Sequence, residues 1–235
     1  MTDGCWISLF SGGKDSSWAL HRALESGRTV TRLVTVHPPG DSYLYHVPAT
    51  DLASLAAESI GIPVLEIEAE DAGVAVESGQ RGDEELAPLE RALEELIMTE
   101  AYEGITAGAV ESRFQRDRLQ AMGDRLGLEL YAPLWQAEPI ETLEQMLEAG
   151  FEIVVVAVAA DGLNEAWLGR TIDREAIAAL ERLRETHGVH PMGEGGEFET
   201  LVTDGPHLDR PIRIEGEPTW DGTRGELLID TARLG

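Results

Sequence analysis

The chain has 235 residues, 43% of them hydrophobic, and a formal net charge of −26 from 44 acidic and 18 basic side chains. This length suffices for one large domain or two modest ones, and no apolar run approaches the roughly 18 residues that span a membrane. A single cysteine, Cys5, excludes an internal disulfide and a CxxC metal site. The acidic excess disfavours extended nucleic-acid binding. Because no charged-then-apolar leader opens the sequence, we expect a cytoplasmic protein.

A glycine-rich loop follows the first apolar run, which extends from Cys5 to Phe10, and a helix-like stretch comes after it. Backbone N–H groups and the positive end of a helix dipole meet at such a turn, so it favours an anion such as phosphate. It is not a Walker A loop, because Ser8 stands where that pattern needs glycine. The loop resembles the SGGxDS loop of ATP pyrophosphatases, which cut ATP between the α and β phosphates; the alternative is a glycine turn that only starts a helix. Its residues are Ser11, Gly12, Gly13, Lys14, Asp15 and Ser16.

Lys14 is the only lysine of the chain, which has seventeen arginines. A sequence that uses the guanidinium everywhere else but keeps one compact, rotatable ammonium in the glycine loop indicates that this group is needed there.

The segments after the loop alternate between helix and strand patterns. Such alternation indicates an α/β fold with a parallel doubly wound sheet, whose ligand lies beyond the carboxyl ends of the strands. Adenine can therefore meet backbone at Val36 and His37, although His37 and His46 can equally be ordinary surface histidines. We expect helices at 15–26, 50–60 and 84–100, and a further helix that ends at residue 126. We expect strands at 29–36, 63–68 and 105–110, and a loop near the site at 71–83.

The second half of the chain changes character. The segment 130–135 is expected to be the last strand of the first domain and its exit, and the last sixty residues are rich in glycine and short strand patterns. We place the domain boundary near residue 128, with domains at 1–128 and 129–235. Beyond it we expect helices at 141–149 and 173–186, and strands at 151–159, around 201, at 211–215 and at 227–230.

Two charged groups are candidates for binding. Arginines at 113, 116 and 118 follow a strand end and can meet phosphate or a carboxylate, although surface ion pairs with Glu111 or Asp117 explain them equally well. Three glutamates, Glu194, Glu197 and Glu199, lie on a glycine-flanked turn where carboxylates can converge on a ligand.

Four motifs together resemble the diphthine ammonia ligase family of ATP pyrophosphatases: residues 11–16, residues 108–112 with Gln115 and Arg118, residues 133–135, and residues 193–200. The resemblance implies a HUP-type nucleotide-binding domain with a smaller C-terminal α+β domain. It also implies ATP and Mg²⁺ as cofactors, and elongation factor 2 and ammonium as partners. Phe114 and Phe198 stand where the family often has tyrosine, so no hydroxyl chemistry is expected there. The residues it implies for nucleotide binding are Ser11 to Ser16, His37, Gly108 and Arg118; those for substrate binding are His46, Glu111, Ser112, Gln115, Trp135, Gly195, Gly196 and Glu199.

The resemblance also implies a mechanism. Lys14 and the loop amides would hold the β and γ phosphates, and Mg²⁺ would bind through Asp15. The diphthine carboxylate would form an acyl adenylate, which ammonia would convert to the amide, with Glu194 or Glu197 binding ammonium and taking its proton. The catalytic residues would thus be Lys14, Asp15, Glu194 and Glu197.

Two other functions remain open at the level of sequence. One is a different ATP pyrophosphatase that adenylates a small carboxylate or a tRNA base, and the other is a non-catalytic HUP nucleotide sensor. Release of AMP and pyrophosphate separates the enzymes from the sensor, and dependence on a diphthine-bearing elongation factor separates the two enzymes.

The acidic surface with almost no lysine predicts adaptation to concentrated salt, in which self-repulsion is screened. We expect the melting temperature to rise as KCl is increased from about 0.1 M to about 1 M, because the Debye length falls from about 10 Å to about 3 Å. Differential scanning calorimetry measures this, and a melting temperature that does not change with salt excludes this explanation of the charge.

Overall fold

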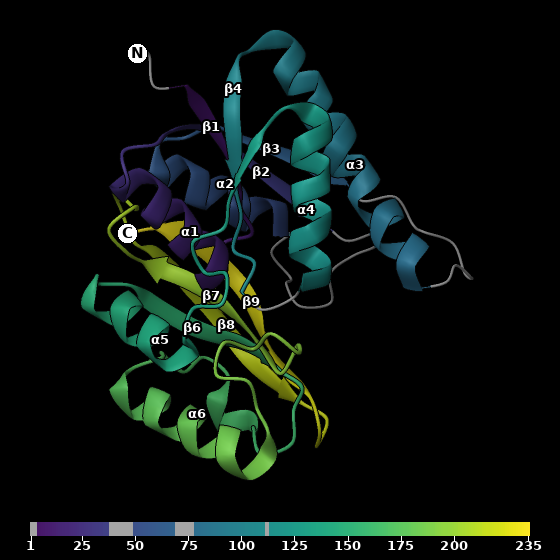
Figure 1. The fold of residues 1–235 in the computed structure, drawn as a ribbon. Coiled ribbons are helices and arrows are strands. Elements are labelled where there is room, and N and C mark those ends of the chain that lie inside the picture. Colours follow the sequence, from purple (N-terminus) through teal and green to yellow (C-terminus); the bar gives the residue numbers. More distant parts are fainter. Residues whose placement is uncertain (1–3, 38–48, 69–77, 111–112) are drawn as a thin grey trace.

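The computed structural model describes residues 4–37, 49–68, 78–110 and 113–235. It contains a parallel sheet of order β3-β2-β1-β4-β5 and an antiparallel sheet of order β7-β6-β9-β8 (Figure 1). The expected α/β fold, with a doubly wound parallel sheet and a C-terminal α+β part, is confirmed. Within the described ranges, no helix is long and apolar enough to cross a membrane.

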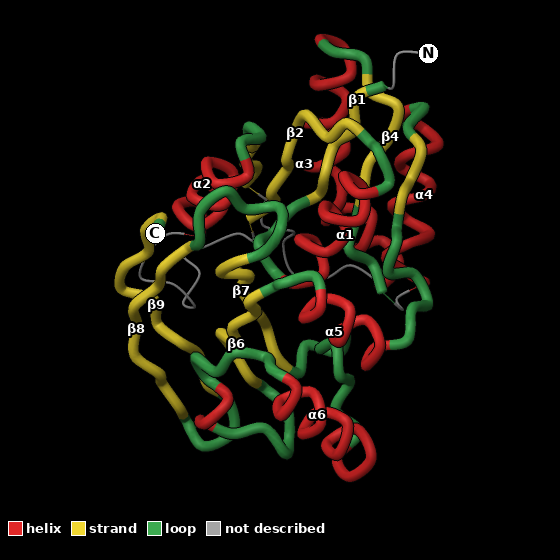
Figure 2. Tube along the Cα trace, turned by 90° about the vertical axis from the view of Figure 1, so that its left-hand side faces the viewer, coloured by secondary structure: helices red, strands yellow, loops and turns green. Residues whose placement is uncertain are grey.

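The parallel sheet is built by strands that alternate with helices along the chain (Figure 2). Its strands are β1 (Cys5–Leu9), β2 (Thr29–His37), β3 (Val64–Glu68), β4 (Tyr102–Thr106) and β5 (Glu129–Tyr131). Its helices are α1 (Lys14–Glu25), α2 (Ala49–Ile60), α3 (Ser78–Thr99) and α4 (Arg113–Leu126).

Apolar residues on both faces of the strands explain why helices cover both sides. In β1, Trp6 packs with residues of α1 and α2, whereas its neighbour Ile7 packs with residues of α3 and α4. In β2, Leu33 and Val34 divide between the same two clusters. Because successive side chains of a strand point to opposite faces, these apolar pairs bury the sheet on both sides.

Several elements differ in extent from the sequence-based expectation. The strand expected at 130–135 ends at Tyr131, and the strand expected at 211–215 continues to Trp220. The strand expected at 105–110 lies at Tyr102–Thr106, and residues 107–110 leave the sheet towards the cavity described below. The loop expected at 71–83 is wrong from Ser78 onward, where α3 begins. Glycine costs a helix only about 1 kcal/mol, and burial of Leu89 and Leu93 further along offsets that cost. Residues 71–77 lie outside the described residues.

The C-terminal half packs helices against one face of the antiparallel sheet. Met146 of α5 and Leu180 of α6 lie in one core cluster with Ile153 and Val155 of β6.

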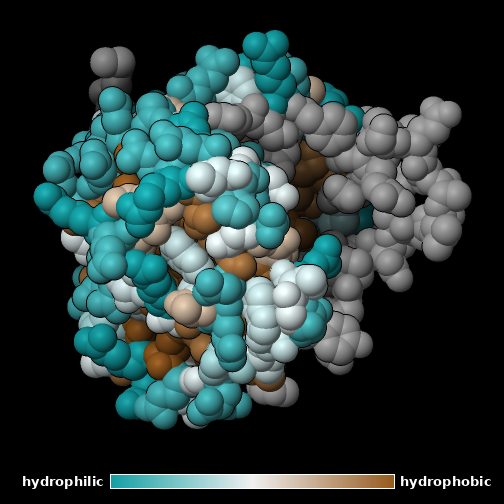
Figure 3. All heavy atoms as spheres, turned by 90° about the horizontal axis from the view of Figure 1, so that it is seen from below, coloured by the Kyte–Doolittle hydropathy of each residue, from teal (hydrophilic) through white to brown (hydrophobic). Residues whose placement is uncertain are grey.

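The parallel sheet ends with β5, so it continues past the domain boundary expected at residue 128; the boundary itself stays a prediction. Seen from the end that carries α6, hydrophilic residues cover most of the described surface, with hydrophobic residues visible between them (Figure 3). The elements are α5 (Pro139–Glu148), β6 (Glu152–Val158), the 3-10 turn η1 (Glu165–Trp167), α6 (Arg174–His187), β7 (Phe198–Asp204), β8 (Ile212–Trp220) and β9 (Gly225–Leu234).

Helix α1 belongs to the cores of both halves. Leu20 and Ala23 pack in the cluster of the parallel sheet, whereas Trp18 and Ala19 pack in the cluster of the antiparallel sheet. A second bridge involves Ser59 of α2, whose Oγ donates to the Arg210 carbonyl at 2.6 Å and accepts from the Arg210 N–H at 3.0 Å. Apolar packing of α1 and hydrogen bonds of α2 therefore both join the two halves, and the glycine-rich loop lies at the N-terminal end of α1.

A buried histidine lies at this interface. The His207 ring stacks on Phe151 with centroids 5.1 Å apart, and Phe151 also contacts Trp18 and His21 of α1. His207 is 8% exposed, and both its ring nitrogens are buried without a hydrogen-bond partner among the described residues. Burial, and secondarily the nearby His21, lowers the pKa of His207 from 6.5 to about 4. The imidazole is therefore neutral in the folded protein.

This histidine predicts a loss of stability in mild acid. Its pKa is lower in the folded than in the unfolded chain, so its contribution is complete above pH 6.5 and is lost as the pH falls towards about 4. His207→Phe, which keeps an aromatic ring against Phe151, should reduce the loss of unfolding free energy between pH 7 and pH 5 by about 2 kcal/mol. Urea denaturation at both pH values measures it; equal pH dependence in both proteins contradicts the prediction.

Candidate active site

A cavity of about 420 Å³ lies beyond the carboxyl ends of β1, β2 and β4. The chain runs from β1 to β2 on one side and reaches β4 on the other, so this is the point where the strand order reverses and where α/β sheets bind ligands. One part of the wall is apolar and the other polar, which suits a nucleoside with its phosphates directed at the glycine loop. The apolar part includes Leu9, Phe10, Val34, Val36 and Leu89; the polar part includes Ser11, Asp15, Ser16 and Arg118.

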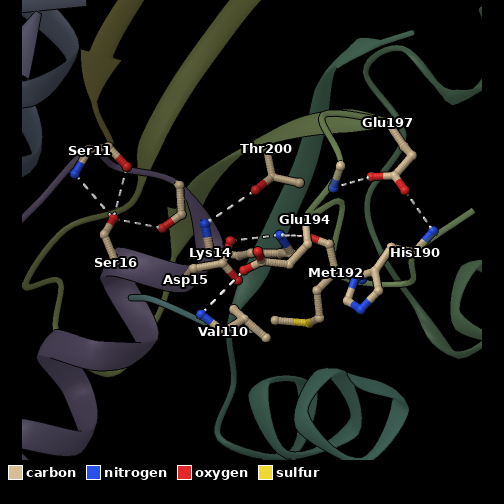
Figure 4. A network of polar contacts seen from close by, with 12 residues as sticks. Ser11, Lys14, Asp15, Ser16, Val110, His190, Met192, Glu194, Glu197 and Thr200 are labelled. Carbon is tan, nitrogen blue, oxygen red and sulfur yellow. Dashed lines mark hydrogen bonds and ion pairs between the residues drawn. The ribbon is translucent and has the colours of Figure 1, made fainter. Parts of the chain in front are cut away.

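The glycine loop is held by the hydroxyl of Ser16. It accepts from the Ser11 N–H at 3.1 Å, donates to the Gly13 carbonyl at 3.1 Å and lies 3.1 Å from the Ser11 hydroxyl (Figure 4). Gly12 has φ +80°, a conformation that favours glycine. Gly13 is the N-cap of α1 and supplies no side-chain cap, so the first turn of the helix presents its amides to the loop.

Lys14 is buried between the two halves and is only 3% exposed. Its Nζ donates to the Met192 carbonyl at 2.5 Å and to Asp15 Oδ2 at 2.9 Å, and it lies 5.4 Å from the centroid of the Phe198 ring. The ammonium thus lies against a carbonyl of the C-terminal half, and its expected role in holding the β and γ phosphates stays a prediction. This carbonyl, the carboxylate and the ring together compensate the burial of the charge.

Asp15 is suited to bind a cation. One carboxylate oxygen accepts from Lys14, and the other, Oδ1, is buried without a hydrogen-bond partner among the described residues although Asp15 lines the cavity. No group of three or more His, Cys, Asp or Glu is gathered as a metal site in the described part of the chain. Mg²⁺ is commonly held by one or two carboxylates together with substrate phosphates and water. A single carboxylate beside the phosphate loop therefore fits this ion.

The glycine-flanked turn of the C-terminal half brings Glu194 to the N-terminal half. Glu194 Oε1 accepts from the Val110 N–H at 3.2 Å, just after the end of β4. Glu197 instead closes its own turn, because its two oxygens accept from the N–H groups of His190 at 3.0 Å and Gly195 at 2.7 Å. Glu194 thus reaches the site, whereas Glu197 fixes the turn that carries it.

The expectation that three glutamates converge is wrong for Glu199. Phe198 and Thr200 of β7 face the phosphate loop, and strand alternation turns the intervening Glu199 to the opposite face. There it lines a separate cavity together with Glu226. Partial burial of its carboxyl group, and secondarily Glu226, raises the pKa of Glu199.

Gly108 is required by close packing. A Cβ atom at this position would lie 2.6 Å from the carbonyl carbon of Asp15 and 2.7 Å from the Ser16 nitrogen, so only glycine lets the end of β4 approach α1. The imidazole of His37 does not line the cavity: its Nε2 lies 3.1 Å from Glu66 Oε2 on β3, while Val34 and Val36 of the same strand form the wall.

The remaining predicted residues divide into three groups. The Arg116 guanidinium carbon lies over the Trp135 ring, 4.8 Å from the ring centroid. Gly195 and Gly196 are exposed at the tip of the turn. His46, Glu111 and Ser112, and the side chain of Gln115, lie outside the described residues.

The sequence analysis missed three contributors to the site. The Met192 carbonyl binds Lys14, the Thr200 hydroxyl accepts from the Lys14 N–H at 3.2 Å, and the Val110 backbone binds Glu194. The Val110 carbonyl also accepts from the N–H of Gln136, which has a φ of 59°, unusual for a residue with a side chain. Backbone partners carry no sequence signal. Thr200 belongs to the motif at residues 193–200, and its place two residues after Phe198 could have indicated that its side chain lies on the same face of the strand.

The fold and the site together define a nucleotide-binding α/β enzyme, in which a second sheet closes on the phosphate loop. Residues 5–130 match the family model of the diphthamide synthase N-terminal domain, and residues 138–234 match that of the diphthamide synthase C-terminal domain. The chain therefore belongs to the diphthamide synthase, or diphthine ammonia ligase, family and is an ATP-dependent ligase.

Curated relatives agree with this assignment. The chain is 31% identical to a diphthine–ammonia ligase of Danio rerio, over 91% of this chain and 87% of the relative, and 32% identical to one of Rattus norvegicus, over 88% and 82%. Among solved structures, a predicted subunit of a tRNA methyltransferase from Methanocaldococcus jannaschii is 19% identical with a TM-score of 0.44, over 86% of this chain and 98% of that one.

The two glutamates of the turn predict different effects on stability. Glu197→Gln should lower the free energy of unfolding by about 1 to 2 kcal/mol, because an amide can accept only one of the two N–H groups and the other loses its partner. Glu194→Gln should change it by less than about 0.5 kcal/mol, because the amide oxygen can still accept from Val110. Denaturant midpoints of the two variants measure the difference, and equal midpoints contradict these separate roles.

Proposed function

We propose that this protein converts diphthine on elongation factor 2 to diphthamide, using ammonium and ATP and releasing AMP and pyrophosphate. The observation that carries the proposal is the junction of the two halves in a chain of this ligase family. Glu194 of the C-terminal half contacts the segment after β4, and the Met192 carbonyl contacts Lys14 of the glycine-rich loop. This junction brings a carboxylate, an ammonium group and the amides of the first turn of α1 to one place.

The nucleoside would occupy the apolar cavity at the switch point, with its phosphates at the amides of the first turn of α1. Lys14 would contact the β and γ phosphates. Asp15 would hold Mg²⁺, which supplies charge compensation for the leaving pyrophosphate.

The diphthine carboxylate would attack the α phosphorus, forming a carboxyl–phosphate bond while the bond to pyrophosphate breaks. Ammonia would then attack the acyl carbon, and AMP would leave with the bonding electron pair. Ammonium must lose one proton before it attacks and the amide nitrogen a second one afterwards. We assign the first of these protons to the Glu194 carboxylate, which lies at the junction and accepts from the Val110 N–H. Glu197 would act by holding the turn.

An acceptor on elongation factor 2 also implies a cytoplasmic location. We make no proposal for a second function, because no described residue favours a tRNA base or a small free acid over a protein-bound carboxylate.

The assay that tests the proposal combines the full chain with ATP, Mg²⁺, ammonium and elongation factor 2. Diphthine-bearing factor should give AMP and pyrophosphate together with a loss of about 1 Da from the factor, as OH is replaced by NH₂; unmodified factor is the matched control and should give neither. Lys14→Arg should lower turnover at least about tenfold, because a planar guanidinium does not reproduce the contacts of the buried ammonium. Release of ADP, or equal turnover with both forms of the factor, contradicts the proposal.

A further inference from the structure

Helix α1 begins without a cap from its own loop. Its N-cap residue is Gly13, which has no side chain to accept from the exposed N–H groups of the first turn. The N–H of Lys14 is nevertheless satisfied, because it donates to the hydroxyl oxygen of Thr200 at 3.2 Å (Figure 4). A hydroxyl of the C-terminal half, 186 residues later in the chain, thus satisfies an N–H group at the start of α1.

Thr200 lies between two other residues of β7 that contact the loop. Two residues before it, the Phe198 ring lies 5.4 Å from Lys14 Nζ; two residues after it, the Val202 N–H donates to the Gly12 carbonyl at 2.9 Å. The Phe198 and Thr200 side chains lie on one face of β7, because alternate residues of a strand share a face, and the Val202 bond is made by the backbone at the strand edge. The fit is close, because a Cβ atom on Gly13 would lie 3.3 Å from the Thr200 carbonyl oxygen.

We propose that Thr200 is a positioning residue for the nucleotide: by accepting the Lys14 N–H it fixes the first turn of α1, and thereby the direction of the amides that meet the phosphates. The C-terminal half would then complete the nucleotide site of the N-terminal half. The inference rests on the proposed function in one respect, namely that the ligand of the loop is ATP.

Thr203 offers a matched control on the same strand. Its hydroxyl is also hydrogen-bonded, donating to Glu152 Oε1 at 2.9 Å, but its side chain lies on the opposite face of β7 from that of Thr200. Thr203→Val removes the same chemical group as Thr200→Val, and both variants keep the β-branched shape that suits a strand.

The test is isothermal titration of the full chain with α,β-methylene-ATP and Mg²⁺, which requires no acceptor and no turnover. Thr200→Val should weaken binding on the order of tenfold, the effect of losing a helix cap. Thr200→Ser, which restores the hydroxyl, should return affinity to within about threefold of the wild type, and Thr203→Val should bind like the wild type. Should Thr200→Val fail to fold, Thr200→Ala enters the same comparison.

Two results overturn the inference: wild-type affinity in folded Thr200→Val, or equal weakening by Thr203→Val, which would assign the effect to general destabilisation of β7. Failure of serine to restore affinity overturns it as well. The proposed function fails separately, if wild-type protein binds the analogue as expected but amidates no diphthine-bearing factor.

Discussion

The site depends on one constraint, the pairing of β7 with the phosphate loop. The Val202 N–H and the Gly12 carbonyl form a backbone hydrogen bond between segments 190 positions apart, and Thr200 adds a second bond to the same loop. Because a glycine loop is intrinsically permissive, it needs such external contacts to hold one conformation. The antiparallel sheet therefore acts as a structural part of the candidate site that this loop forms.

The apolar packing of α1 explains how this pairing is maintained. Trp18 and Ala19 pack with the C-terminal core, and Leu20 and Ala23 with the N-terminal core, so the helix cannot rotate without disrupting both. Its N-terminus carries the loop, and a displacement of either sheet would therefore move Lys14. The buried ammonium has the same dependence, because a carbonyl of the C-terminal half is one of its partners.

Local patterns in the sequence predicted most of the elements and the phosphate loop. Apolar residues at helix and strand spacing, such as Ile7 and Val34, report directly on burial, and the glycines of the loop report on a required turn. The predicted position of β4 was too far along the chain, because residues 107–110 are as apolar as a strand. In the structure they instead approach α1 closely, as Gly108 shows. Motifs thus indicate where a site is, while long-range packing decides which face each side chain takes.

The turn 193–197 shows why that packing could not be predicted from the sequence. Glu194, Glu197 and Glu199 have the same chemistry and nearly the same spacing, yet one reaches across to Val110, one closes its own turn and one faces the other side of the sheet. Their separation follows from Gly193 and Gly196, whose positive φ values reverse the chain before β7 begins, and from alternation once it has begun. Only Glu194 is then left with a carboxylate directed at the other half. Since the loop amides belong to the N-terminal half and this carboxylate to the C-terminal half, the candidate site is built by both halves of the chain.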